Sequence, residues 1–294
     1  MSLPFDNRDG WIWLNGEFVP WREANTHVIN QGLHYGSCVF EGERAYNGKI
    51  FKSTEHTDRL FNSAEILGIS IPYSKNEINQ AKEVLIKKMN FSNCYVRPVI
   101  WRGSHQMGIS TNNAEIHAAI AVWEDWESYF PMEKRLKGLQ LITSPWKRPS
   151  PDTAPHEAKA SGLYMICTMS KEFAEKKGFD DCLMLDHRNY VAEGTGANIF
   201  FIKDDSIYTP IADCFLNGIT RQTVIEIVKN KGFNLEEKYI KQDDLKNFDE
   251  AFLTGTAAEV TPIRSIDKIN FSIGENTETF KIMNDFSDFV KSSN

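Results

Sequence analysis

The stretch CLMLDHRNYVAEGTGANIFFIKDDSIYTP, residues 182–210, decides the fold class that the sequence predicts. Its strand-like segments CLMLD (182–186), YVAEG (190–194) and NIFFIKDDSIYTP (198–210) are joined by short polar or glycine-containing turns. Runs of this length between turn residues are typical of β-strands. No helical segment separates them, so this part of the chain departs from the strict β-α alternation of a parallel sheet.

The flanking sequence adds hairpins and helices. WIWLNGEFVPW (11–21) and RAYNGKIFK (44–52) each place Asn-Gly between apolar runs, which is a strong hairpin signal. Helices are predicted at residues 55–67, from Ser74 with Glu77 completing a capping box, and over GITRQTVIEIVKNKGF (218–233). Hairpins mixed with helices predict a mixed α/β, or α+β, fold.

The chain has 294 residues, enough for two domains. The pattern breaks into charged and aromatic residues at EDWESYFPMEKRLKG (124–138), where we place the boundary. We expect an N-terminal α/β domain at residues 1–127, an interdomain loop at 128–137 and a C-terminal domain at 138–294.

Composition excludes several classes of function. Hydrophobic residues make up 41% and charged residues 25%, as in a globular protein in water. A net charge of −7 argues against nucleic-acid and anionic-membrane partners, because both require a basic surface. The five cysteines include no C-x-x-C pair, and no signal peptide or membrane span is evident. We therefore expect a cytoplasmic protein.

TAPHEAKASGLY (153–164) surrounds Lys159 with small residues that leave room for a flat ligand. A desolvated lysine amine is a nucleophile suited to Schiff-base chemistry, for which the usual cofactor is pyridoxal 5'-phosphate. His156-Glu157 begins an H-E-x-x-H motif, but position 160 is Ala160 rather than a second histidine. We therefore predict no metal.

Four further features fit this cofactor. Glu193, among apolar residues and glycines, could hold the pyridine nitrogen, or it could be a solvated turn residue. Gly218, Ile219 and Thr220 start a helix whose free N–H groups favour an anion, although Thr220 could simply cap that helix. Thr256 lies in a second loop of small residues, LTGTAAE. Arg59 could pair with a phosphate or lie on a solvated helix face.

Taken together, these motifs resemble the branched-chain amino acid aminotransferases of the fold-type IV pyridoxal-phosphate family, almost from end to end. The resemblance rests on LHYGSCVFEG (33–42), EHTDRLFNSA (55–64), YVRP (95–98), AKASGLY (158–164), EGTGANIF (193–200), GITR (218–221) and GTAAEVTPIR (255–264). It implies a two-domain fold like that of D-amino acid aminotransferase, with a smaller N-terminal α/β domain and a larger C-terminal domain containing a barrel-like sheet.

The resemblance also implies roles for individual residues. Lys159 would form the internal aldimine and shuttle the proton, Glu193 would pair with the pyridine nitrogen, and Tyr164 would bond the phenolic oxygen. The other implied cofactor ligands are Arg59, Gly196, Leu216, Gly218, Ile219, Thr220, Gly255 and Thr256. The implied substrate pocket comprises Tyr35, Phe40, Gly42, Tyr95, Arg97, Met107, Ile109, Trp126, Tyr129, Ala257 and Ala258, the last two through backbone N–H groups.

The implied reaction is reversible ping-pong transamination of L-leucine, L-isoleucine and L-valine with 2-oxoglutarate. Arg97 among aromatic rings suits both an aliphatic side chain and a second carboxylate. The alternatives are other fold-type IV enzymes, such as D-amino acid aminotransferase or aminodeoxychorismate lyase, and a ligand-binding protein without catalysis. Glu43, Leu163 and Ala197 depart from the common family pattern. Family members form homodimers or larger assemblies, and we expect the same here.

Overall fold

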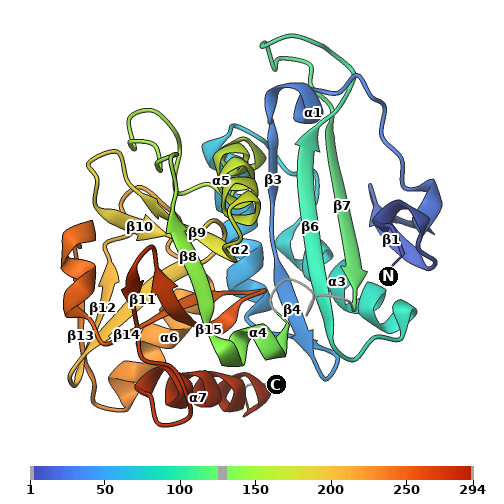
Figure 1. The fold of residues 1–294 in the computed structure, drawn as a ribbon. Helices are drawn as coiled ribbons and strands as arrows, with labels where there is room; N and C mark the ends of the chain where they lie inside the picture. Colours follow the sequence, from blue (N-terminus) through green and yellow to red (C-terminus); the bar gives the residue numbers. More distant parts are fainter. Residues whose placement is uncertain (1–2, 125–130, 293–294) are drawn as a thin grey trace. The chain divides into compact units, whose positions relative to one another are not determined.

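The computed structural model describes residues 3–124 and 131–292 and has a mixed α/β architecture (Figure 1). The described chain divides into two compact units. The first comprises residues 3–124 and the short segment 158–162, and the second comprises residues 131–157 and 163–292. The sequence-based prediction placed residues 158–162 in the C-terminal domain, whereas the structure groups them with the first unit.

The first unit is built around one sheet. Its helices are α1 (Gln31–Tyr35), α2 (Ser53–Ile66) and α3 (Lys75–Met89). Its strands are β1 (Trp11–Leu14), β2 (Glu17–Pro20), β3 (Cys38–Phe40), β4 (Glu43–Tyr46), β5 (Lys49–Ile50), β6 (Cys94–Arg102) and β7 (Ile116–Trp123). The strand order is β2-β1-β7-β6-β4-β5, with β3 also paired to β6. All pairings in this sheet are antiparallel.

Local sequence signals account for much of this unit. Both predicted hairpins form, and their Asn-Gly turns have positive φ angles, for example 51° at Asn15 and 96° at Gly16. Asparagine and glycine tolerate this left-handed backbone, which matches the twist of the flanking strands. The predicted capping box of α3 is confirmed, because Ser74 accepts from the Glu77 N–H and Glu77 accepts from the Ser74 N–H.

A closed ring of strands forms the centre of the second unit. Its strands are β8 (Leu139–Thr143), β9 (Asp181–Leu185), β10 (Val191–Glu193), β11 (Asn198–Lys203), β12 (Ser206–Pro210), β13 (Asn234–Lys238), β14 (Glu250–Gly255), β15 (Glu259–Ile266) and β16 (Ile269–Asn270). The path β10-β9-β8-β15-β14-β11 closes because β10 also pairs with β11. The barrel-like sheet implied for the C-terminal domain is therefore confirmed.

Each strand of this ring contributes to one apolar core. The buried cluster includes Leu141, Leu183, Val191, Ile199, Leu253 and Ile263, one from each of the six strands. Side chains alternate between the two faces of a strand, so this cluster takes one face of every strand in turn. Closure leaves no free edge among the six strands of the ring, and it fixes β10 and β11 on both sides.

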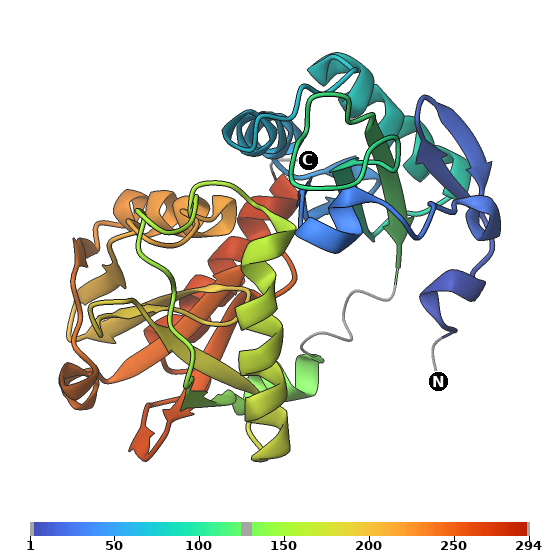
Figure 2. The ribbon, with the colours of Figure 1, turned by 90° about the horizontal axis from the view of Figure 1, so that it is seen from above.

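The helices of the second unit cover the outside of this ring. They are α4 (Met132–Lys137), α5 (Met165–Lys176), α6 (Ile219–Asn230) and α7 (Glu278–Ser292). In Figure 2, α6 and α7 lie side by side, and both pack against β14. Residues 132–137, expected within the interdomain loop, instead form α4, which Arg135 ties to Glu259 at 2.8 Å. Among the helices of the described residues, none is long and apolar enough to cross a membrane.

Candidate active site

Lys159 belongs to the first unit, where its backbone is fixed on two sides. The Phe40 N–H donates to the Lys159 carbonyl at 3.1 Å, and Ala160 forms a bridge with Val39 of β3. The Lys159 N–H donates to the Ser63 hydroxyl of α2 at 2.9 Å. The lysine is thus held beside β3 and α2 by backbone bonds, and its ammonium lies 5.0 Å from the centre of the Phe40 ring.

The environment of Lys159 favours its neutral amine. Burial lowers its pKa to about 8, and the neighbouring Arg59 guanidinium acts in the same direction, while the Glu41 carboxylate opposes them. A lysine with its ordinary pKa of 10.5 is almost fully protonated near neutral pH. The lowered pKa gives Lys159 a larger share of free amine, which is the nucleophilic and basic form.

Arg59 lies on α2 and faces the residues between β3 and β4 rather than open solvent. Its Nε donates to Glu41 Oε1 at 2.6 Å and its Nη2 donates to Glu41 Oε2 at 2.8 Å. His56 Nδ1 lies 2.7 Å from the same Oε2. Glu41 and His56 were not among the predicted site residues. Their signal in the sequence was the i, i+3 spacing of His56 and Arg59, which puts both on one helix face.

Four predicted pocket residues, Arg97 of β6 among them, lie close together. The Arg97 guanidinium carbon lies 4.8 Å from the centre of the Phe40 ring and 5.4 Å from that of Tyr95. A Cβ added to Gly42 would lie 2.0 Å from the Tyr95 hydroxyl, so a larger residue fits here only if the Tyr95 ring moves. Trp123, which was not predicted, lies 5.8 Å from the same guanidinium carbon.

The other pocket residues predicted in the first unit lie at its surface. Tyr35 ends α1, whereas Met107 and Ile109 lie in the loop between β6 and β7, and all three are exposed. The Gln31 side chain ties this loop to α1 by donating to the carbonyls of residues 108 and 110. Trp126 and Tyr129 lie outside the described residues.

Glu193 belongs to the second unit, at the end of β10, and both of its carboxylate oxygens have partners. Oε1 lies 3.3 Å from Arg148 Nε, and Oε2 accepts from the Asn198 amide at 3.2 Å. Glu193 is buried, so it is not the solvated turn residue that the sequence left open. The positive charge of Arg148 and the hydrogen bond from the Asn198 amide stabilise the Glu193 carboxylate. Without such partners, burying this charge would cost free energy.

Asn198 connects Glu193 to the start of α6. Its amide also donates to the Leu216 carbonyl at 2.9 Å, and its Oδ1 accepts from the Gly218 N–H at 3.1 Å. A Cβ on Gly218 would lie 2.3 Å from that Oδ1, which explains the glycine. Neither Asn198 nor Arg148 was predicted, although Asn198 was visible as a polar residue opening an apolar strand.

The start of α6 has the features of an anion site. Gly218 is its N-cap and makes no side-chain cap, and Thr220 is not the cap of this helix. The first N–H groups of a helix have no carbonyl partner within it, and the helix dipole adds to their attraction for an anion. Ile219 and Thr220 are both buried in this first turn.

The turn between β14 and β15 lies beside the Glu193 loop. A Cβ on Gly255 would lie 3.4 Å from both the Gly196 carbonyl oxygen and the Ala197 Cβ, so the two turns are in close contact. Thr256, Ala257 and Ala258 follow in the β14–β15 turn. The second unit thus brings two of its predicted cofactor segments, the loop after Glu193 and this turn, directly together.

Tyr164 ends a short 3-10 helix directly before α5. Tyr164 and Glu193 share one electrostatic partner, Arg148. Burial would lower the pKa of Arg148, but the charges of Glu193, Cys167 and Tyr164 act in the opposite direction and raise it. The predicted partner of the phenolic oxygen and the predicted partner of the ring nitrogen therefore both influence the pKa of the same guanidinium.

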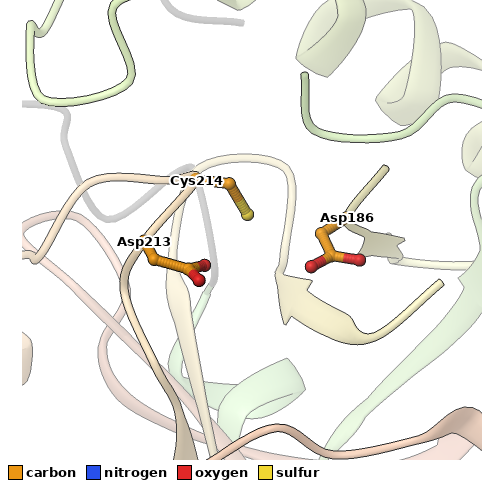
Figure 3. A group of neighbouring side chains, drawn as sticks. All are labelled: Asp186, Asp213 and Cys214. Atoms are coloured by element: carbon orange, nitrogen blue, oxygen red, sulfur yellow. The ribbon is translucent and has the colours of Figure 1, made fainter. Parts of the chain in front are cut away.

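A separate group in the second unit has the composition of a metal site. Asp186, Asp213 and Cys214 place their ligand atoms within 4.8 Å of one another (Figure 3). Arg188 already binds both carboxylates, with 2.8 Å from its Nε to Asp186 and 2.8 Å from its Nη2 to Asp213. Burial raises the pKa of the Cys214 thiol to about 12, which disfavours the thiolate that binds metals. We interpret this group as an ion pair that closes a surface turn.

Comparisons with known proteins agree with this arrangement. Residues 38–266 match the model of the family described as Amino-transferase class IV. The branched-chain-amino-acid aminotransferase of Pseudomonas aeruginosa is 45% identical over 265 residues, covering 89% of this chain and 86% of the relative. The enzyme of that name from Escherichia coli (strain K12) is 36% identical over 269 residues, covering 90% and 87%.

Solved structures give the same result. The T.th. branched-chain amino acid aminotransferase with pyridoxamine 5'-phosphate superposes with a TM-score of 0.91 at 36% identity, covering 97% of this chain and 95% of that one. The same enzyme complexed with N-(5'-phosphopyridoxyl)-L-glutamate gives a TM-score of 0.90 at 36% identity, covering 98% and 96%. The chain therefore belongs to the class IV aminotransferases, and within them to the branched-chain-amino-acid aminotransferase family.

Proposed function

We propose that this enzyme transfers the amino group of L-leucine, L-isoleucine or L-valine to 2-oxoglutarate, giving the branched 2-oxo acid and L-glutamate in a reversible ping-pong reaction. The observation that carries this proposal is the environment of Lys159, whose pKa is lowered to about 8 by burial beside Phe40 and Arg59. A buried amine of this kind is the central requirement of a pyridoxal-phosphate aminotransferase.

The residues present fit pyridoxal 5'-phosphate. In the second unit, the buried carboxylate of Glu193 suits a protonated ring nitrogen, and the N-terminus of α6 with Thr220 suits a phosphate. Gly218 keeps the backbone at this turn free of a side chain that would clash with Asn198. Thr256, Leu216 and Gly196 would complete the same site, and Tyr164 would bond the phenolic oxygen. In the first unit, Arg59 would hold the phosphate.

When bound, this cofactor supplies an electrophilic carbon and a ring that accepts electrons from the substrate Cα. The protein's own contribution is the movement of one proton. Lys159 Nζ, neutral in a useful fraction because of its lowered pKa, would remove the proton from the substrate Cα and later return it. The backbone bonds from Phe40 and to Ser63 hold the lysine in place while its amine moves.

The pocket around Arg97 would serve two kinds of substrate. Phe40 and Tyr95 offer aromatic faces to a hydrocarbon side chain, and the Arg97 guanidinium over these rings can bind the second carboxylate of glutamate. The backbone N–H groups of Ala257 and Ala258 would bind the α-carboxylate, which both kinds of substrate share. The residues around Arg97 would therefore suit the side chains of both partners of the exchange.

The surface of the first unit supports self-association. Six large apolar residues of α1, the segment before it and the loop between β6 and β7 are exposed: Val28, Ile29, Leu33, Tyr35, Met107 and Ile109. Grouped apolar side chains of this kind are typical of protein interfaces. We propose that the enzyme is a homodimer or a larger homo-oligomer, with this surface in the interface.

A substrate panel tests the proposed activity. Glutamate formation should be observed with each of L-leucine, L-isoleucine and L-valine together with 2-oxoglutarate, and Lys159→Ala should lower the rate by about a thousandfold or more. The holoenzyme should have a visible absorption band that borohydride abolishes. Turnover of D-alanine or aminodeoxychorismate, without turnover of the three branched amino acids, would instead identify a different class IV enzyme.

A further inference from the structure

We propose that Glu41 is a positioning residue for cofactor binding: its buried carboxylate, with His56, holds the Arg59 guanidinium in the orientation that binds the cofactor phosphate. This inference rests on the proposed function, in which Arg59 is a phosphate ligand. It adds two residues that neither the sequence motifs nor the comparisons assign.

The contact between Glu41 and Arg59 has the geometry of a fixed fork. Two parallel bonds, Nε to Oε1 at 2.6 Å and Nη2 to Oε2 at 2.8 Å, define both the position and the plane of the guanidinium. A single charge contact would leave the guanidinium free to rotate, whereas a bidentate pair does not. The Glu41 side chain has an exposed fraction of 0%, compared with 16% for Arg59, so the carboxylate lies on the inner side of the pair.

The carboxylate of Glu41 is itself held in place. Glu41 Oε2 lies 2.7 Å from His56 Nδ1 and accepts a hydrogen bond from the Gly42 N–H at 3.2 Å. The Glu41 N–H donates to the Pro98 carbonyl at 2.9 Å. His56 and Arg59 lie three residues apart on α2, so one helix face presents both to the same carboxylate. Backbone and side chain of Glu41 are therefore tied to β6 and α2.

The charge state of Glu41 agrees with this role. Burial alone would raise its pKa, but Arg59 and His56 hold the pKa well below its ordinary value. A carboxylate in this setting stays ionised over the whole physiological range, so the fork with Arg59 does not depend on pH there. Glu41 also opposes the effect of Arg59 on the pKa of Lys159. The same charges therefore influence both the proposed phosphate ligand and the amine.

Glu43 provides a matched control within the same strand region. It is as fully buried as Glu41, but its partner is Lys82, at 2.8 Å from Nζ to Oε2. Lys82 also donates to the Thr57 hydroxyl at 2.8 Å. Neutralising Glu43 therefore removes a carboxylate that is as buried as that of Glu41 and lies two residues from it in the sequence. Both bonds between Glu41 and Arg59 stay in place.

The experiment compares cofactor affinities of protein freed of cofactor. Dissociation constants for pyridoxal 5'-phosphate and for pyridoxal, which lacks the phosphate, are measured by visible absorption for the wild type, Glu41→Gln, Glu43→Gln and Arg59→Gln. The constant for pyridoxal divided by that for pyridoxal 5'-phosphate isolates the phosphate contribution. Glu41→Gln should reduce this ratio by about tenfold, the effect expected for one charge-assisted bond pair. Glu43→Gln should leave it unchanged.

Arg59→Gln separates the inference from the proposed function on which it rests. If Arg59→Gln keeps the wild-type ratio, Arg59 is not the phosphate ligand and that part of the proposed function fails. If the ratio falls in Arg59→Gln but stays at the wild-type value in Glu41→Gln, the positioning role of Glu41 is overturned. In the Arg59→Gln background, Glu41→Gln should have no further effect on the ratio, because Glu41 acts through Arg59.

Folding is controlled in the same experiment. A general loss of structure would weaken both ligands equally and leave their ratio unchanged, so it cannot imitate the expected result. If Glu41→Gln yields no folded protein, Glu41→Asp is measured instead. Aspartate keeps the charge but is one methylene shorter, so it cannot make both bonds to Arg59 in the present backbone. The ratio should again fall, and an unchanged ratio would overturn the inference.

Discussion

Glu193 and Asn198 are cross-strand partners in β10 and β11, and the Asn198 amide donates to the Glu193 carboxylate at 3.2 Å. The same asparagine binds Leu216 and Gly218 at the start of α6. One side chain thus fixes the distance between the proposed partner of the ring nitrogen and the proposed phosphate site. In the proposed function both groups would bind one rigid cofactor, so an error in this distance would weaken both contacts.

Asn198→Ala should therefore weaken cofactor binding. It removes the bond to Glu193 and the two backbone bonds at Leu216 and Gly218, and we expect the dissociation constant for pyridoxal 5'-phosphate to rise by about tenfold or more. Titration of cofactor-free protein by absorbance measures this. Asn234→Ala is the matched control, because the Asn234 amide donates to the Ser206 hydroxyl at an exposed position. Equal affinity of the two variants would contradict the bridging role.

Gly42→Ala should damage the substrate pocket. The added Cβ would lie 2.0 Å from the Tyr95 hydroxyl and 3.0 Å from its ring carbon Cζ, so the ring must move. We expect the KM for L-leucine to rise by about tenfold, since displacements on the order of 1 Å have large effects on substrate placement. Steady-state kinetics checks this. Adding Tyr95→Phe removes the closest clash and should restore part of the affinity, whereas a purely additive loss would exclude this clash as the cause.

The pKa of Lys159 predicts a pH dependence in cofactor-free protein. The folded pKa is about 8 and the ordinary value is 10.5, so free amine appears as pH rises through 8. Between these values the unfolded chain binds more protons than the folded one, and this residue's penalty on stability decreases as pH rises. Reductive methylation of Lys159, followed by mass spectrometry, should show an inflection near 8. Arg59→Gln should move it upward, because a positive neighbour is removed, and an inflection near 10.5 would refute the shift.

The buried pair Glu43–Lys82 should matter for stability rather than for catalysis. Both side chains have an exposed fraction of 0%. Lys82→Met leaves the carboxylate without this partner and should lower the free energy of unfolding by about 3 kcal/mol. Replacing both residues, as Lys82→Met with Glu43→Leu, should recover most of this loss. Urea denaturation measures the three free energies. A double variant no more stable than Lys82→Met would show that the pair is not simply a compensated buried charge.

Local patterns in the sequence predicted local structure well. The Asn-Gly hairpins and the capping box of α3 depend on residues next to one another, and both are confirmed. The bridge between Ala160 and Val39 and the closure of β10 on β11 depend on which strands meet in three dimensions. A single sequence carries no local signal for such pairings, so the return of residues 158–162 to the first unit was not predicted.

The predicted site shows the same limit. Lys159 and Glu193 were proposed as site residues because their sequence neighbours are small or apolar, and Arg59 was proposed because EHTDRLFNSA resembles a motif of the family. Glu41 was missed because a glutamate between Phe40 and Gly42 gives no sign that it is buried. Its partners come from α2, at positions where a helix normally presents charges to water. A buried charge is recognised only from the partners that stabilise it, and these were not known before the fold was.

The closed ring of the second unit also determines where this protein tolerates change. β13 is the last strand on its side of the sheet and, in the described path, pairs only with β12. Extra residues on its outer side would therefore break no pairing between strands. β10 has three residues and partners on both sides. One residue inserted there would turn the Glu193 side chain to the opposite face. Engineered extensions therefore belong at β13, while insertions into the short strand that carries Glu193 should be avoided.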